Sequence, residues 1–121
     1  MVKAIGSSLE REFDTYWRVF ASNLPAPIEE HRFAKGRRWR FDRAFLPEKV
    51  AVELEGGVYA NGRHTRASGF IGDCDKYNRA AIEGWLVLRF TTKHLTDNPL
   101  EVVAQVKQAL ASRKAVTSVK P

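Results

Sequence analysis

Three carboxylates occur where the sequence predicts β-strands. Asp42 lies within RRWRFDRAF (37–45), and Glu53 and Glu55 lie within VAVELE (50–55). Aspartate is disfavoured inside strands, and an unpaired carboxylate is costly in a strand as apolar as the second one. Because side chains alternate along a strand, Glu53 and Glu55 face the same way. These acids are therefore the first candidates for chemistry.

A short turn at 46–49 favours pairing of these two strands, which would bring Asp42 near Glu53. We then expect all three carboxylates to converge at one end of a sheet. Clustered carboxylates repel one another and are stable mainly when a hard cation neutralises them. Mg²⁺ suits such oxygen ligands, with Mn²⁺ as its substitute and phosphate as a remaining ligand. In the structural alternative, the acids pair with Arg38, Arg40 and Arg89.

Hydrophobic periodicity predicts the elements that would position these acids. It indicates helices over 8–22 and 67–83, strands over 31–34, 37–45, 50–55 and 85–90, and a last helix from Pro99. The connection from 50–55 to 85–90 is long enough for parallel pairing. The order α-β-β-β-α-β-α predicts a single-domain α/β fold with a central mixed sheet flanked by helices. We expect the domain over 1–112 and a flexible tail over 113–121.

The same patterns predict which side chains share a face. In the helix at 67–83, the expected core stripe is Phe70, Cys74, Tyr77 and Ala81, and Gly84 is expected to end the helix. Trp39 and Trp85 are expected in the core. Strict alternation along 37–45 places Arg38, Arg40, Asp42 and Ala44 on one face, and Trp39, Phe41, Arg43 and Phe45 on the other.

The chain is basic, with a formal net charge of +6, which favours phosphate polymers as partners. Many of the cations fall in one stretch, where they are interleaved with Phe33, Trp39 and Phe41. They are His31, Arg32, Lys35, Arg37, Arg38, Arg40 and Arg43. This pattern predicts a strand whose basic face contacts nucleic acid, and the alternative is a solvated strand edge protected by its charge.

Signals for membranes or for secretion are lacking. No apolar run is long enough to span a bilayer, and the N-terminal segment has no apolar stretch of a signal peptide. We therefore expect no membrane partner and an intracellular, cytoplasmic location. Cys74 is the single cysteine, so an internal disulfide cannot form.

Four segments together resemble the PD-(D/E)xK nuclease superfamily, and within it the Vsr-like, phage-type endonucleases. They are RRWRFDRAF, VAVELEGG, GRHTRASGFIGDCDKYNRAAIEGW and LVLRF, within residues 8–92. The resemblance implies a restriction-endonuclease-like α/β core, bound Mg²⁺ and hydrolysis of DNA phosphodiester bonds. If the chain is phage-encoded, it would act in the host cytoplasm.

The resemblance also implies roles for individual residues. Asp42 would be the central metal ligand, Glu53 a second ligand and the Leu54 backbone carbonyl a further one. Glu55 stands where the family usually has a catalytic lysine, which helps to activate water and to stabilise charge on the phosphate. Lys76, on the following helix, is the candidate to replace that lysine, and the alternative is a solvated helix lysine.

Further candidates come from the first helix and from the segment after the acidic strand. The family often has an acid on its first helix, for which Glu10 is the first candidate and Glu12 the alternative. His64 would contact the scissile phosphate or act as a base, unless it is an ordinary surface histidine. Arg63 and Arg66, like Arg38 and Arg40, would hold phosphates by hydrogen bonds.

Two other functional classes stay open at this stage. Glu55 in place of lysine favours a non-catalytic nucleic-acid-binding module on a nuclease fold. A basic subunit that binds an acidic protein is the other rival. RNA stays open as a target, and strict sequence recognition would need a partner or a homodimer.

Overall fold

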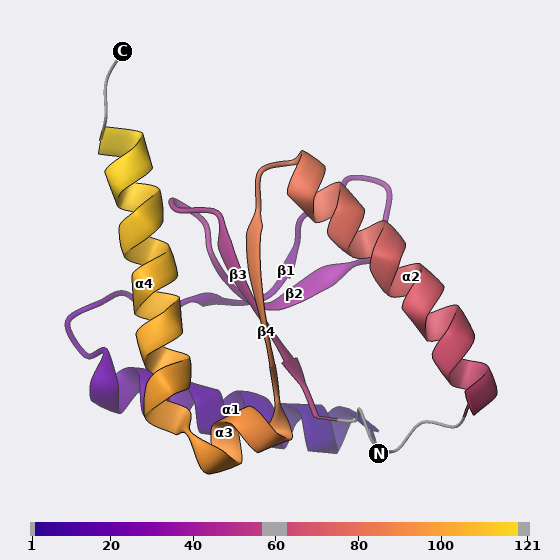
Figure 1. The fold of residues 1–121 in the computed structure, drawn as a ribbon, viewed down its shortest axis with the longest axis horizontal. Coiled ribbons are helices and arrows are strands. Elements are labelled where there is room, and N and C mark those ends of the chain that lie inside the picture. The colour runs from indigo at the N-terminus through magenta and orange to yellow at the C-terminus, as the bar shows by residue number, and fades with distance from the viewer. Residues whose placement is uncertain (1, 57–62, 119–121) are drawn as a thin grey trace.

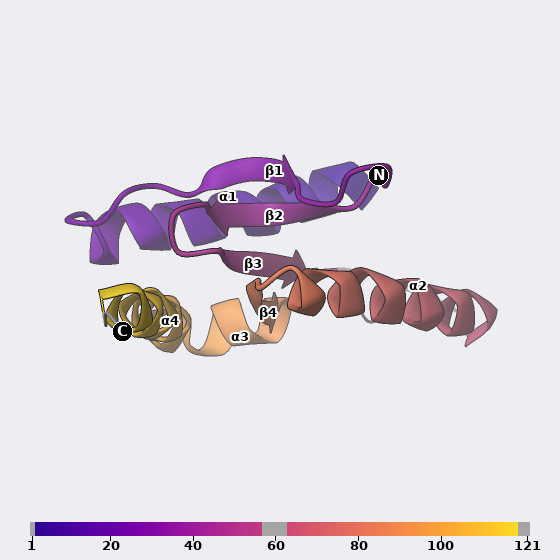
Figure 2. The same ribbon diagram turned by 90° about the horizontal axis from the view of Figure 1, so that it is seen from above.

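A four-stranded mixed sheet organises the fold, with strand order β1-β2-β3-β4 (Figures 1 and 2). The computed structural model describes the backbone of residues 2–56 and 63–118 and the side chains of 8–56 and 67–114. The elements are α1 (Val2–Phe20), β1 (Ile28–Arg32), β2 (Arg40–Phe45), β3 (Val50–Glu55), α2 (Arg63–Ile82), β4 (Leu86–Thr91), α3 (Thr92–Asp97) and α4 (Pro99–Ser118). The predicted order is confirmed, with α3 added as a short helix between β4 and α4.

The strand pairings follow from the connections between the strands. The tight connections β1–β2 and β2–β3 give antiparallel pairs, whereas the helical crossover through α2 makes β3 and β4 parallel. Gly36 and Lys49, with φ of 83° and 56°, adopt the left-handed conformation at the two tight turns. The predicted α/β class with a mixed sheet is therefore confirmed.

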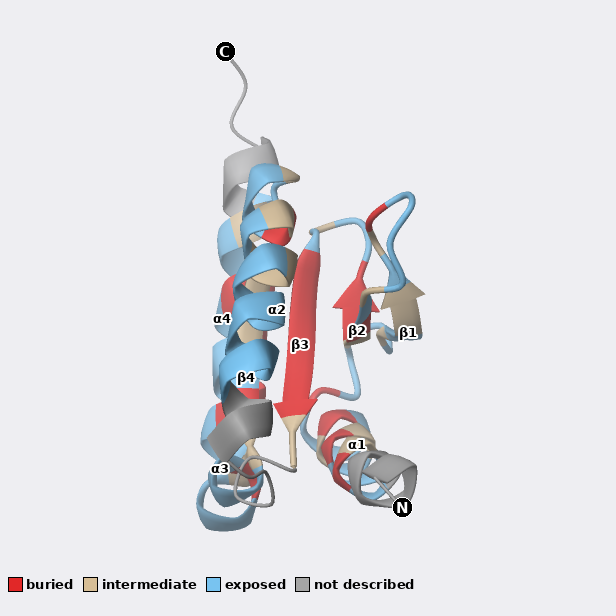
Figure 3. Ribbon diagram, turned by 90° about the vertical axis from the view of Figure 1, so that its right-hand side faces the viewer, coloured by how far each residue is buried: buried red, intermediate tan, exposed pale blue. Residues whose placement is uncertain are grey.

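Helices cover both faces of the sheet (Figure 1). The larger core lies between the sheet and the helices α1, α3 and α4, and it contains Phe13, Trp17, Val52, Leu95 and Val106. A smaller cluster lies on the α2 side and consists of Phe41, Ala44, Ala51, Ala80 and Trp85. β3 is buried along almost its whole length between these two layers (Figure 3). A charged side chain on β3 therefore needs partners inside the fold.

The core stripe predicted for α2 is wrong in most positions. Phe70 is 68% exposed and Cys74 and Ala81 are also exposed, while Tyr77 is half-buried and Ala80 is fully buried. The helix begins at Arg63, four residues before the predicted start at 67, and it extends beyond the strands (Figure 2). Periodicity identified an apolar face, but the sheet covers only the C-terminal part of α2, through a different face.

Strict alternation along β2 also fails. Arg43 and Phe45 contact residues of α1, as alternation predicts, but Phe41 packs with Ala44 in the cluster on the α2 side. Residues at odd and even positions can share a face only where the strand departs from regular geometry. The departure lies between Phe41 and Arg43, at Asp42.

Element boundaries differ modestly from those expected. β1 begins at Ile28 instead of 31, and α4 continues to Ser118, past the position where the tail was expected to start. Gly84, with φ of 89°, ends α2 as predicted, and the N–H groups of Gly84 and Trp85 donate to the carbonyls of Ala81 and Ala80. Among the described residues, every helix is too short or too polar to cross a membrane.

Candidate functional site

At Asp42, the pairing of β2 is interrupted toward both of its neighbouring strands, β1 and β3. Toward β1, the register pairs the flanking residues, Glu29 with Arg43 and His31 with Phe41. In the described part of β1 and β2, the register has no pair at the intermediate position, where Glu30 would face Asp42. Toward β3, the pairing ends at Arg43. The backbone groups around Asp42 must therefore find other partners, because unpaired buried amides are costly.

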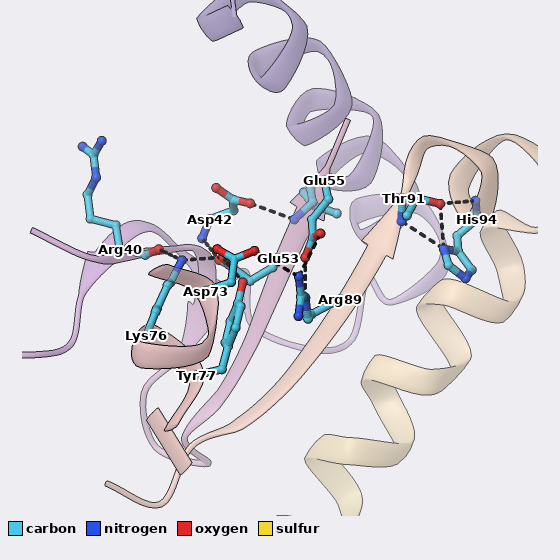
Figure 4. Close-up of polar contacts among 11 residues, drawn as sticks. Arg40, Asp42, Glu53, Glu55, Asp73, Lys76, Tyr77, Arg89, Thr91 and His94 are labelled. Atoms are coloured by element: carbon cyan, nitrogen blue, oxygen red, sulfur yellow. Dashed lines mark hydrogen bonds and ion pairs between the residues drawn. The ribbon is translucent and has the colours of Figure 1, made fainter. Parts of the chain in front are cut away.

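Side chains take the place of the missing ladder bonds (Figure 4). The Asp42 N–H donates to Glu53 Oε2 at 2.8 Å, and the Leu54 N–H donates to Asp42 Oδ2 at 2.7 Å. The Asp42 carbonyl accepts from Arg43 Nη1 at 2.6 Å. The two predicted carboxylates are thus fixed against each other's strands, as the predicted pairing through the turn at 46–49 requires.

Glu53 is held from the α2 side by two further donors. Its side chain is 8% exposed, and its Oε1 lies 2.6 Å from Lys76 Nζ and 2.9 Å from the Tyr77 hydroxyl. Lys76 also donates to the Arg40 carbonyl at 2.8 Å. Burial, followed by the charge and hydrogen bond of Glu53, raises the pKa of Tyr77 above its usual value, so the phenol keeps its proton and donates a hydrogen bond to Glu53.

Two acids from other elements lie beside Asp42. Glu10 of α1, Glu30 of β1 and Asp42 each offer a carboxylate oxygen within 4.8 Å of the others, and all three are half-buried. Glu30 has φ of 52°, a left-handed conformation that is uncommon for a residue other than glycine. Arg43 Nη1 lies 3.1 Å from Glu10, and Arg40 Nε lies 3.4 Å from Glu30. Oxygen donors this close together suit a hard cation.

The electrostatics of Asp42 reflect this crowding. Burial raises the pKa of Asp42 to about 7, the charge of Glu53 adds to the increase, and the hydrogen bond from Leu54 opposes it. Burial also raises the pKa of Glu10, although Arg43 counteracts part of that effect. A carboxyl group with so high a pKa gains from a nearby positive charge, because the cation favours its ionised form.

Arg43 is a structural residue and not part of a basic DNA-binding face, so the prediction that grouped it with the exposed cations is wrong. Its side chain is 4% exposed, and its guanidinium binds Asp14 with two hydrogen bonds of 2.8 Å. Burial alone would lower the pKa of Arg43, but Asp14 and Glu10 outweigh it and raise the pKa. The bidentate pair ties α1 to β2.

The structure does not bring Glu55 into the acid cluster. Arg89 Nε and Nη2 donate to its two carboxylate oxygens at 2.5 and 3.1 Å, and Arg89 also lies 3.6 Å from Asp73 (Figure 4). The expected convergence of three acids from the two strands is thus correct for Asp42 and Glu53 and wrong for Glu55. For Glu55, the structural alternative of pairing with Arg89 is the observed one.

The other predicted residues divide into three groups. Lys76 and Glu10 lie at the site, whereas Glu12 is exposed on another face of α1. Arg38 and Arg40 are exposed, as phosphate contacts require. The side chains of Arg63, His64 and Arg66 lie outside the described residues.

Sequence reasoning missed Glu30 and Tyr77 as parts of the site. Glu30 could have been found only from the register of β1 on β2, since β1 was expected to begin three positions later. Tyr77 follows Lys76 directly and was read as a core residue. Its hydroxyl could have suggested a polar partner in that core.

Comparison with known proteins adds no relative. The chain matches no model of a known protein family, no curated protein and no solved structure.

Proposed function

We propose that this chain is a metal-dependent endonuclease that hydrolyses DNA phosphodiester bonds. The observation that carries the proposal is the gap in the sheet at Asp42. There, two carboxylates replace backbone partners, and Lys76 contacts one of them. Strand irregularities of this kind are frequent next to active sites, where they redirect side chains. The resemblance to PD-(D/E)xK nucleases, which depends on the same residues, supports the same function.

The residues at the gap fit a hard divalent cation such as Mg²⁺. Asp42, Glu10 and Glu30 offer oxygens close to one another. Burial and the charge of Glu53 raise the pKa of Asp42, so a bound cation would stabilise its ionised form. Glu53 could add Oε2, which accepts one hydrogen bond, and Leu54 its backbone carbonyl. The Leu54 N–H donates to Asp42. In a strand, the N–H and the carbonyl of one residue point toward the same neighbouring strand, so the Leu54 carbonyl also points toward β2. A bound Mg²⁺ would supply a water of lowered pKa and stabilise negative charge on the phosphate.

Lys76 takes the role of the lysine that Glu55 does not provide. Two of its three N–H donors are directed to Glu53 and to the Arg40 carbonyl, and these fix the amine beside the acids. The third donor is suited to a phosphate oxygen or to the attacking water. Tyr77 completes the hydrogen bonds to Glu53 and keeps that carboxylate oriented.

The exposed cations next to the site are suited to the DNA backbone. Arg38 and Arg40 are exposed, and Lys76 links Arg40 directly to the acid site through the Arg40 carbonyl. Together with the net charge of +6, they should make binding weaken steeply as salt rises.

The test is nicking of supercoiled plasmid in Mg²⁺, in Mn²⁺ and in EDTA, by the wild type and by Asp42→Ala. We expect metal-dependent nicking that falls by about 100-fold or more in Asp42→Ala. Glu101→Ala, which removes an exposed acid from α4, is the matched control for a lost carboxylate. Equal nicking by wild type and Asp42→Ala would show that a contaminant or another site cuts the DNA.

One observation favours a second candidate function, a non-catalytic nucleic-acid-binding module. Lys76, Arg40 and Arg43 already contact Glu53, Glu30 and Glu10, so cations of the chain itself lie against these acids. Salt-sensitive DNA binding without cutting of plasmid, branched or single-stranded DNA in either metal would establish that candidate instead.

A further inference from the structure

Planar side chains stack in series along the β1–β2 hairpin. The rings of Phe33 and Phe41 lie 4.1 Å apart with planes 8° apart, and those of Phe33 and Trp39 lie 6.3 Å apart at 17°. The guanidinium of Arg37 covers the Trp39 ring at 4.0 Å from its centroid. The series runs from Phe41, which is fully buried, through the half-buried Phe33 and Trp39, to Arg37, which is exposed. Trp39, expected in the core, thus lies at the surface end.

The buried end of this series adjoins the candidate active site. Phe41 immediately precedes Asp42, and Lys76 Nζ lies 5.8 Å from the centroid of its ring. Lys76 also binds the Arg40 carbonyl, between Trp39 and Phe41 in sequence. A ligand that rests on Arg37 and Trp39 would therefore extend toward the acids along the same hairpin.

The segment that carries this series is basic. Residues 31–41 contain no acid, and their exposed cations are Arg32, Lys35, Arg37, Arg38 and Arg40. Aromatic and guanidinium planes set among exposed cations are the means by which proteins hold single strands. The cations attract the phosphates and the planes stack on bases.

We propose that Arg37 and Trp39 form a stacking platform for unpaired nucleobases of the substrate strand. In a duplex the base faces are covered by their neighbours, so such a platform is useful only where bases are unpaired or displaced. The inference rests on the proposed function only for the claim that the bound strand is then cut. Binding itself is independent of hydrolysis.

The test compares two fluorescent oligonucleotides of equal length, an oligothymidine and its abasic counterpart, which has the same phosphates without bases. Binding is measured by anisotropy with the intact chain in EDTA, so that no hydrolysis occurs. We expect the strand with bases to bind roughly tenfold more tightly. An oligouridine with its own abasic counterpart reports whether RNA bases use the platform as well as DNA bases.

Two variants isolate the stacking groups. Arg37→Lys keeps the charge and removes the planar group, and Trp39→Leu removes the ring beneath it. Both should lose most of the preference for bases while they still bind the abasic strand. Arg18→Lys, on the exposed surface of α1, is the matched control and should keep the preference.

If Trp39→Leu fails to fold, Arg37→Lys provides the test, because Arg37 is exposed. Equal affinity for base-containing and abasic strands, or a preference that survives in Arg37→Lys, would overturn the platform. Plasmid nicking measured in parallel separates the two proposals. Base-dependent binding without cutting rejects the nuclease and keeps the platform, whereas cutting without base preference rejects the platform alone.

Discussion

Glu53 and Glu55 lie two residues apart on the same face of β3, but their surroundings differ. Glu53 has an 8% exposed side chain, and it accepts hydrogen bonds from Lys76, Tyr77 and the backbone of Asp42. The Glu55 side chain is 26% exposed, and its partner Arg89 is 45% exposed. One carboxylate belongs to the interior of the fold, and the other belongs to a surface ion pair.

The difference shows that β2, and not the position in β3, determines which glutamate contacts Asp42. Glu53 lies opposite Asp42, where β2 leaves the ladder, so its carboxylate replaces a backbone acceptor. Glu55 lies past that point, within reach of an arginine from β4. Exposed ion pairs contribute little to stability, whereas loss of one partner from a buried pair leaves a costly charge.

The largest effect is expected from Lys76→Met, which leaves Glu53 buried without its cation. We expect a loss of about 3 kcal/mol in the free energy of unfolding, measured by urea denaturation. The matched variant Arg89→Met removes the cation of Glu55 and should cost less than about 1 kcal/mol. Equal losses in the two variants would contradict the distinction between the two glutamates.

An intermediate effect is expected from pH. Asp42 has a pKa of about 7 in the folded chain and about 3.9 in an unfolded one, so between these values the folded state binds the extra proton. Stability should therefore fall as pH rises from about 4 to about 7, and Glu10, with its raised pKa, acts in the same direction.

Urea unfolding between pH 5 and pH 8 checks this expectation. Asp42→Asn should flatten the decrease, because the amide does not titrate. Mg²⁺ should raise the melting temperature of the wild type more at pH 8 than at pH 5, since the cation competes with the proton. A wild-type profile that already matches that of Asp42→Asn would place the Asp42 pKa near its ordinary value.

The smallest effect is expected from Glu55→Gln. Its exposed pair with Arg89 is worth less than about 1 kcal/mol, and plasmid nicking should stay close to the wild-type rate. A large loss of nicking with unchanged stability would show that Glu55 takes part in the reaction after all, as the grouping of the three carboxylates in the sequence first suggested.

The sequence predicted what depends on local patterns. Alternation identified β3 and placed Glu53 and Glu55 on one face, and the short turn predicted its antiparallel pairing with β2. The resemblance directed attention to Lys76, and Gly84 marked the end of α2. Each of these predictions needs only neighbouring residues or a motif of fixed spacing.

Long-range packing decided the rest. Phe70 and Ala81 form an apolar face on α2, but the sheet meets a different face of the helix, through Ala80. The sequence did not distinguish Arg43 from the other cations, because its partner Asp14 lies on α1, far away along the chain. Glu30 reaches Asp42 through the β1 register and an unusual backbone conformation, neither of which the sequence displays.

The most direct test of the central claim is a Mn²⁺ titration followed by electron paramagnetic resonance. We expect saturable Mn²⁺ binding by the wild type and by Glu55→Gln, and loss of this binding in Asp42→Asn. Binding that survives in Asp42→Asn, or that disappears in Glu55→Gln, would contradict the assignment of the cation site to the gap at Asp42.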